Sequence, residues 1–243
     1  MSQAAGFVAL LVALAVHGGS IDGRSLALGL AAGAGGGAGL AAFYRALALG
    51  TMSIVSPVVA CGAVVPFAIS LATGERPSAV SLAGAVVALA GAVLASVEES
   101  RAPARERAQA VALAVVAAGA LGVFTYFLGL GSREGSALST LLGARVGSLS
   151  CLLLLAAFRG ATLRVGYRGL APVVAVGLAD VGANALFAIA SGHGLLALVA
   201  VLGSLYPVTT VLLAHLLLAE RLTRVQLAGV GVALAGVAAL SVG

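Results

Sequence analysis

The residues best suited to bind or move a solute are polar side chains that interrupt long apolar runs. Asp180 stands in the middle of the apolar run 170–190. A carboxylate there costs about 2.5 to 3.5 kcal/mol to insert into a bilayer, so Asp180 must face protein or water rather than lipid. Asn184 and Phe187 follow at helical spacing and share a face with Asp180. This face is a candidate binding surface.

An arginine stands in the preceding apolar run, 137–158, where a basic side chain is equally costly. At a rise of about 1.5 Å per residue, Arg145 and Asp180 fall at about the same depth, which allows the two to pair. Two interpretations stay open at this point. The pair is either a structural ion pair that joins two helices, or part of a substrate or proton site.

Further polar residues are candidates for the same function. Tyr206 and Thr209 lie on one face of the apolar run 195–218, and Tyr44 occupies the matching end of a helix in the first half. His215 lies on the opposite side from Tyr206, where a membrane-boundary hydrogen bond and proton coupling are the alternatives. The candidate substrate-binding residues are therefore Asp180, Asn184, Tyr206, Thr209, Arg145 and Tyr44.

No arrangement typical of an enzyme accompanies these residues. The sequence has no HExxH, no Gly-x-Ser-x-Gly and no Walker motif, and its three histidines lack metal-ligand spacing. Cys61 and Cys151 lie inside apolar runs without a CxxC neighbour, so we expect them to be small packed side chains. We predict neither catalysis nor a metal site nor a cofactor.

The composition identifies the environment of these runs. Of 243 residues, 61% are hydrophobic and 9% are charged, and the mean hydropathy is +1.17. Soluble domains carry about 25% charged residues, so these runs belong in a bilayer. The thirteen basic residues are all scattered arginines, which argues against nucleic-acid binding. Nine helices are predicted, at residues 4–16, 26–49, 53–73, 80–97, 108–130, 137–158, 170–190, 195–218 and 225–242.

The chain contains an internal repeat. Residues 75–91 align without gaps on residues 220–236 at a shift of 145, with eleven of seventeen positions identical. The match includes a Glu-Arg pair at each helix boundary, which we interpret as a turn and topology determinant. It also includes glycines seven residues apart, which favour close helix packing. These glycines are Gly84, Gly91, Gly229 and Gly236.

The two halves differ in polarity. At a shift of 144, Asp180 and Asn184 fall on Gly36 and Leu40, whereas Phe187 falls on another phenylalanine. Polar groups are thus present in one half only. A binding site needs such an asymmetry, and a face used only for packing does not.

These residues resemble EamA-domain proteins of the drug/metabolite transporter superfamily. Each half has a Gly-Glu-Arg-like turn before a Gly-rich final helix, at 74–76 and 219–221, with related segments at 54–57, 205–208 and 122–126. The resemblance implies an all-α polytopic membrane protein, in which ten helices form two inverted repeats around a cavity that opens to each side in turn. Pro57, Pro66 and Pro207 are expected to interrupt helices beside such a cavity.

We assign residues 1–98 to a first EamA-like repeat that lacks its first helix, 99–107 to a linker, and 108–243 to a second repeat. Because the counterpart of 108–130 is missing from the first half, we expect the functional protein to have ten helices, with either a start upstream of Met1 or a truncated gene here. The positive-inside rule places the C-terminus outside, whereas the resemblance implies a cytoplasmic one, so orientation stays open.

The resemblance implies a secondary transporter that moves a small metabolite by alternating access, with an amino-acid-like or drug-like exporter substrate. The absence of an ATP-binding motif favours either coupling to a proton or ion gradient or facilitated passage. Expected partners are the lipid bilayer, the substrate and a second copy of the chain in a homodimer. The expected location is the cell membrane, as a multi-pass protein of a bacterial inner membrane. A non-transporting membrane partner or lipid-handling subunit is the alternative.

Overall fold

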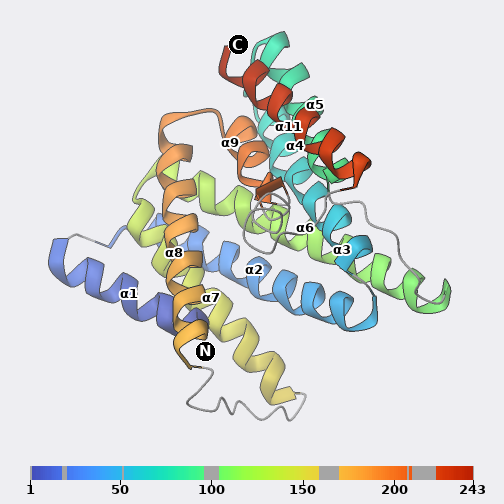
Figure 1. Cartoon of the computed structure of the whole chain (residues 1–243). Coiled ribbons are helices and arrows are strands. Elements are labelled where there is room, and N and C mark those ends of the chain that lie inside the picture. The colour runs from blue at the N-terminus through green and yellow to red at the C-terminus, as the bar shows by residue number, and fades with distance from the viewer. Residues whose placement is uncertain are drawn as a thin grey trace. The chain divides into compact units, whose positions relative to one another are not determined.

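The computed structural model describes residues 2–17, 21–50, 52–95, 104–158, 170–206, 208–209 and 223–242, and all regular structure in these residues is helical (Figure 1). Seven predicted helices, 4–16, 26–49, 80–97, 108–130, 137–158, 170–190 and 225–242, are present in the described residues with ends that differ by a few residues. The predicted helix 53–73 is divided, and only the first part of 195–218, which includes α9, lies within the described residues. The elements are α1 (Ser2–His17), α2 (Gly23–Leu49), α3 (Met52–Ala60), η1 (Cys61–Ala63), α4 (Val64–Ala72), α5 (Ala79–Ala95), α6 (Ala104–Glu134), α7 (Ala137–Phe158), α8 (Leu170–His193), α9 (Leu196–Gly203) and α11 (Arg224–Val242).

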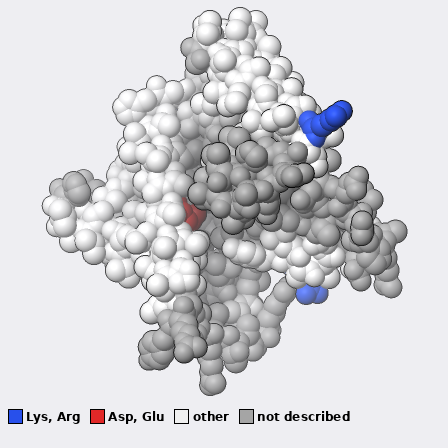
Figure 2. Space-filling view, viewed as in Figure 1, with Lys and Arg blue, Asp and Glu red and all other residues white. Residues whose placement is uncertain are grey.

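Within the described residues, four helices are long and apolar enough to cross a membrane, and the others that are apolar are shorter. The four spans are Gly23–Leu49, Ala108–Glu134, Ala137–Phe158 and Leu170–His193. Charged side chains are sparse on the described part of the face in Figure 2, as a surface that meets lipid requires. The protein is a polytopic helical membrane protein, as predicted.

The predicted helix 53–73 is broken into α3, η1 and α4. Pro66 lacks a backbone N–H, so the carbonyl of Gly62 loses its helical partner, and the chain tightens into the 3-10 turn Cys61–Ala63. The interruption predicted at Pro66 is confirmed. The one predicted at Pro57 is wrong, since α3 continues through that position. Pro207 lies outside the described residues.

The Gly-Glu-Arg turn is a Schellman cap. The N–H of Glu75 donates to the carbonyl of Ser70 at 3.0 Å, and the N–H of Gly74 donates to that of Leu71 at 3.2 Å. Gly74 has a φ of 105°, a left-handed conformation that only glycine adopts without strain. The turn therefore satisfies the last carbonyls of α4 and directs the chain toward α5.

The chain divides into two compact units, and each takes segments from both halves of the sequence. Unit 1 is residues 1–38 and 123–194, and unit 2 is residues 39–122 and 195–243. The boundaries fall inside α2 and α6. The helix α6 begins at Ala104, so the expected linker 99–107 is helical from that residue onward.

In unit 2, α5 and α11 pack antiparallel along a seam of small residues. We call Gly84, Ala88 and Gly91 of α5, with Gly229, Ala233 and Gly236 of α11, the small-residue seam. A Cβ on Gly84 would lie 2.9 Å from the carbonyl oxygen of Gly236, and one on Gly91 would lie 2.8 Å from that of Gly229. No side chain fits at these four glycines without moving a backbone.

The repeat makes this seam symmetric. At the shift of 145, Gly84 corresponds to Gly229 and Gly91 to Gly236, so the contact Gly84–Gly236 maps onto the contact Gly229–Gly91. An operation that exchanges two antiparallel helices in this way is a local two-fold axis perpendicular to them. Opposite directions for equivalent helices are what an inverted repeat requires.

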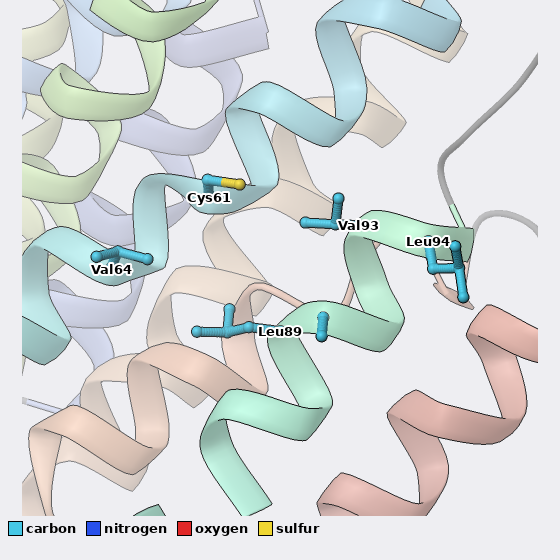
Figure 3. Close-up of a pocket in the computed structure, with 6 residues that line it drawn as sticks. Cys61, Val64, Leu89, Val93 and Leu94 are labelled. Atoms are coloured by element: carbon cyan, nitrogen blue, oxygen red, sulfur yellow. The ribbon is translucent and has the colours of Figure 1, made fainter. Parts of the chain in front are cut away.

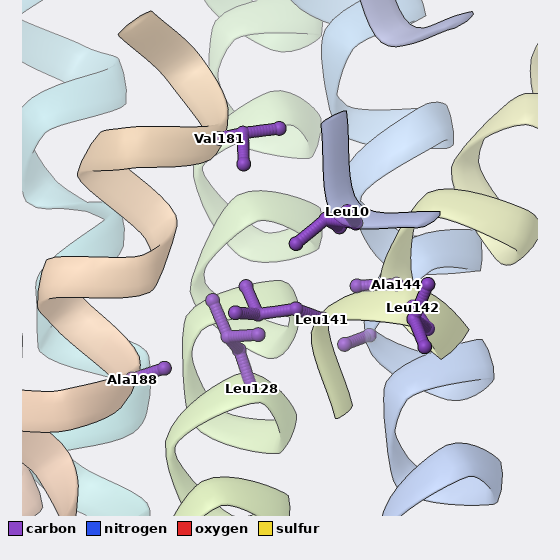
Figure 4. Close-up of a cluster of buried hydrophobic side chains, with 8 residues drawn as sticks. Leu10, Leu128, Leu141, Leu142, Ala144, Val181 and Ala188 are labelled. Carbon is purple, nitrogen blue, oxygen red and sulfur yellow. The ribbon is translucent and has the colours of Figure 1, made fainter. Parts of the chain in front are cut away.

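Unit 1 uses glycines to bring α1, α7 and α8 together. A Cβ on Gly6 of α1 would lie 3.1 Å from the carbonyl oxygen of Gly177 in α8 and 3.6 Å from the Cζ atom of Arg145 in α7. The buried apolar core of this unit joins the same helices to α2 and α6, and Figure 4 shows its side chains converging. Its members are Leu10, Ala32, Leu128, Leu141, Leu142, Ala144, Val181 and Ala188. Close packing therefore fixes the polar residues on these three helices.

Candidate functional site

Arg145 and Asp180 form an ion pair between α7 and α8. The Nη1 atom of Arg145 lies 2.6 Å from the Oδ2 atom of Asp180. The side chain of Arg145 is 5% exposed, whereas that of Asp180 is 42% exposed. The predicted pairing is confirmed. The arginine is enclosed by its unit, and the carboxylate reaches the surface of that unit.

Three more polar side chains complete a group that we call the polar cluster: Gln3, Arg145, Ser148, Asp180 and Asn184. The Oε1 atom of Gln3 accepts from Nη1 of Arg145 and, at 3.2 Å, from Oγ of Ser148. The Nε2 atom of Gln3 donates to Oδ2 of Asp180 at 3.4 Å. The Nδ2 atom of Asn184 lies 3.5 Å from Oδ1 of Asp180. Gln3 thus contacts both partners of the ion pair.

The ion pair uses a single contact, although arginine and carboxylate commonly pair through two parallel hydrogen bonds. Among the described residues, the buried Nη2 atom of Arg145 has no hydrogen-bond partner. In the carboxylate, the Oδ1 atom of Asp180 accepts only the long hydrogen bond from Nδ2 of Asn184 among the described residues. An unpaired buried donor costs about 1 to 3 kcal/mol. The cluster therefore holds unused hydrogen-bonding capacity of both kinds.

Sequence reasoning found Arg145, Asp180 and Asn184 but missed Gln3 and Ser148. A charged residue inside an apolar run stands out because insertion is costly, whereas Ser148 is one of several serines in its run and Gln3 lies in the first turn of α1. Their role depends on which helices meet. Phe187, predicted on the same face as Asp180, packs half-buried against the apolar core of unit 1.

The other predicted site residues belong to unit 2. Tyr44 is 65% exposed and tilts against Phe43, with 5.7 Å between the ring centroids. Tyr206 is 43% exposed. The hydroxyl of Thr209 donates to the carbonyl of Leu205 at 3.4 Å. A binding role for Tyr44, Tyr206 and Thr209 remains a prediction, and His215 lies outside the described residues.

Glu75 joins the turn after α4 to the start of α9 in unit 2. Its two carboxylate oxygens accept from the backbone N–H groups of Leu196, at 3.0 Å, and Ala197, at 2.9 Å. These N–H groups belong to the first turn of α9 and have no partner within the helix. The negative charge also suits the positive end of the helix. Glu75 therefore caps a helix 121 residues away in sequence.

One cavity among the described residues of unit 2 is apolar. It measures about 320 Å³ and is lined by Cys61, Val64, Leu89, Ala90, Val93 and Leu94 (Figure 3). Among these described lining residues, Cys61 alone carries a polar side-chain group, its thiol. Within the described residues, no three His, Cys, Asp or Glu side chains lie close enough to hold a metal ion.

Outside the apolar spans, the start of α2 carries its own polar contacts. The Oδ2 atom of Asp22 accepts from the N–H of Ser25 at 2.8 Å. Hydrogen bonding from the side chain and then the backbone of Ser25 holds the pKa of Asp22 below its ordinary value. Arg24 and Glu134 form a second ion pair in unit 1, also at 2.6 Å, with side chains 73% and 38% exposed.

Comparisons with known proteins support the same fold. The sequence model of the EamA-like transporter family matches residues 108–242. No curated protein matches this chain. One solved chain, described as "Crystal structure of protein", has a TM-score of 0.66 and 21% identity over 99% of this chain and 98% of its own. At that identity the likeness shows the fold alone.

Proposed function

Because this chain belongs to the EamA-like transporter family, we propose that it is a secondary transporter that moves a small metabolite by alternating access. The observation that carries this proposal is the polar cluster. Two charged side chains near the middle of apolar helices are costly to insert. A binding site needs hydrogen-bonding groups that are not already used, and in this pair the buried Nη2 atom of Arg145 has no described partner while the carboxylate of Asp180 reaches the surface of its unit.

The chemistry of the cluster suits a small polar substrate. When the transport cycle exposes the buried Nη2 atom of Arg145, it can donate to a carboxylate or carbonyl oxygen, and Oδ1 of Asp180 can accept from an amine or hydroxyl. An amino-acid-like metabolite carries both groups. We propose such a substrate, exported across the cell membrane of a bacterium and coupled to a proton or ion gradient, by a chain that acts as a monomer or homodimer.

Purified protein tests the proposal in two steps. A thermal-shift screen against amino acids and related metabolites identifies ligands, and uptake of each ligand is then measured in proteoliposomes with and without a proton gradient. We expect ligand-dependent flux, which Asp180→Asn abolishes while the protein still inserts. Asparagine keeps an acceptor for Arg145 and removes the charge. Glu134→Gln, in the exposed ion pair, is the matched control and should transport normally.

A lipid-handling or non-transporting subunit would give a different result. It would show no solute flux with any ligand, and its thermal stability would respond to lipid headgroups instead. Full flux through a well-inserted Asp180→Asn variant would instead move the binding site away from the polar cluster.

A further inference from the structure

The geometry around the ion pair assigns a function to Gln3. We infer that Gln3 is a positioning residue, which holds Arg145 and Asp180 in a single-contact arrangement and so keeps the buried Nη2 atom and Oδ1 from pairing with each other before a substrate binds. The inference rests on the proposed function of the polar cluster. It adds a residue of α1 to a site that otherwise consists of residues on α7 and α8.

The first step is the choice of atoms. Gln3 accepts from Nη1 of Arg145 and donates to Oδ2 of Asp180, the same two atoms that make the ion pair. The amide therefore lies across the existing contact and leaves the other side of each charged group untouched. If Gln3 only supplied hydrogen bonds to unpaired polar atoms, it would instead contact Nη2, the buried atom without a described partner.

The second step is the anchoring of Gln3. Its Oε1 atom also accepts from Oγ of Ser148, which is buried one turn after Arg145 on α7. A glycine, Gly6, lies one turn after Gln3 on α1 and lets α1 approach α8 and the guanidinium closely. Side chains held at two or more points orient the groups they contact. Gln3 is therefore fixed from both α7 and α1.

The third step is what happens without the amide. Arginine and carboxylate favour two parallel hydrogen bonds, in which Nη2 would contact Oδ1. With Gln3 gone, Nη1 and Oδ2 lose their shared third partner, and the pair is free to rotate into that closed arrangement. In that arrangement Nη2 donates to Oδ1, so neither atom is left to contact a substrate. Gln3 thus favours binding at the expense of the most stable ion pair.

Solid-state NMR tests this inference without any substrate. The chain has two aspartates, Asp22 and Asp180, so an Asp22→Asn background leaves Asp180 as the one aspartate carboxylate. Protein labelled with guanidino-¹⁵N arginine and γ-¹³C aspartate then reports the Arg145–Asp180 geometry by dipolar dephasing. We expect Gln3→Leu to increase dephasing, because a second Nη atom comes close. Gln3→Glu should decrease it, because a new carboxylate competes for Arg145.

These opposite signs separate positioning from a structural role. If Gln3 only holds helices together, both substitutions loosen the pair and dephasing falls in each. That result, or unchanged dephasing in Gln3→Leu, overturns the inference. Gln109→Leu is the matched control, since Gln109 is exposed on α6. If Gln3→Leu does not fold, Gln3→Met replaces it with a side chain of similar length.

Transport then links the geometry to function. With any ligand that the wild-type protein carries, Gln3→Leu should raise KM about tenfold with little change in kcat, as loss of one charge-assisted contact predicts. Absence of flux in the wild type would defeat the proposed function and leave the NMR result standing. Normal KM in a variant whose ion pair has closed would overturn the positioning role alone.

Discussion

The small-residue seam and the polar cluster join helices in opposite ways. In the seam, antiparallel α5 and α11 meet at glycines and alanines that the repeat places in both halves, and shape alone decides the contact. In the polar cluster, α1, α7 and α8 meet around charges that the repeat supplies to one half only. The seam is symmetric and the cluster is asymmetric.

This difference suggests that the small-residue seam serves the assembly of the helices, whereas the polar cluster serves the activity of the protein. Helices gain little from apolar burial when lipid is the alternative, so the seam needs the close approach that glycine allows. In the polar cluster, by contrast, each polar group on α1, α7 and α8 lowers the stability of the fold unless its hydrogen-bonding partners are all present and well placed. Polar residues that are present in one repeat and replaced by apolar residues in the other are therefore the best candidates for binding.

The largest effect is expected where a buried charge loses its partner. Asp180→Ala leaves Arg145 enclosed without a counter-ion, so we expect a loss of about 3 to 5 kcal/mol in the free energy of unfolding. Arg145→Ala should cost less, because the carboxylate of Asp180 is 42% exposed. Reversible unfolding in mixed detergent micelles measures both values. Equal losses would show that exposure does not distinguish the two partners.

A double substitution separates stability from function in the same cluster. Arg145→Met with Asp180→Leu replaces the pair by apolar side chains of similar size, which is often neutral or stabilising in buried positions. We expect near wild-type stability and no transport. Glu134→Ala, which breaks the exposed ion pair to Arg24, should cost about 0 to 1 kcal/mol and leave transport intact.

Next in size is a methyl group added to the small-residue seam. In Gly91→Ala the new Cβ would overlap the backbone of Ala233, so α5 and α11 must separate, and we expect a loss of about 1 to 3 kcal/mol. Gly231→Ala is the matched control on α11, because its Cβ would meet no atom within 4 Å. Better helix propensity should make that variant neutral or slightly more stable. Equal losses in the two variants would contradict the role of shape.

The sequence predicts the helices well because their signal is local. The runs 137–158 and 225–242 depend on apolar length alone, and the structure reproduces them to within one residue. The break before Pro66 also follows from one residue. Helix partners are a different matter, since nothing in the period of α1 shows that Gln3 meets Arg145. The pairing of Arg145 with Asp180 was predictable because two opposite charges at the same depth of neighbouring apolar helices each favour the other as a partner.

A smaller effect is expected from the hydrogen bonds between Glu75 and the start of α9 in unit 2. Glu75→Gln replaces a carboxylate that caps α9 with an amide that offers one acceptor, so about 1 kcal/mol should be lost. Hydrogen exchange should quicken at the amides of Leu196 and Ala197 and stay unchanged in the small-residue seam. Protection equal to that of the wild type at both amides would refute the cap.

The smallest effect concerns the other aspartate of unit 1. Hydrogen bonds from Ser25 to the Asp22 carboxylate lower its pKa from 3.8, so the folded state binds a proton less readily than the unfolded chain. The resulting stabilisation is present above about pH 4 and is lost as the pH falls through the lower folded pKa. Asp22→Asn caps without a charge, so its thermal midpoint should lack this component.

Subtraction of the two midpoints at each pH isolates Asp22 from every other carboxylate. The wild-type midpoint minus that of Asp22→Asn should be constant between pH 5 and pH 7 and should fall below about pH 4. A flat difference down to pH 2.5 would show that the cap does not depend on charge. Any pH dependence of the midpoint that remains in the Asp22→Asn variant then comes from groups other than Asp22.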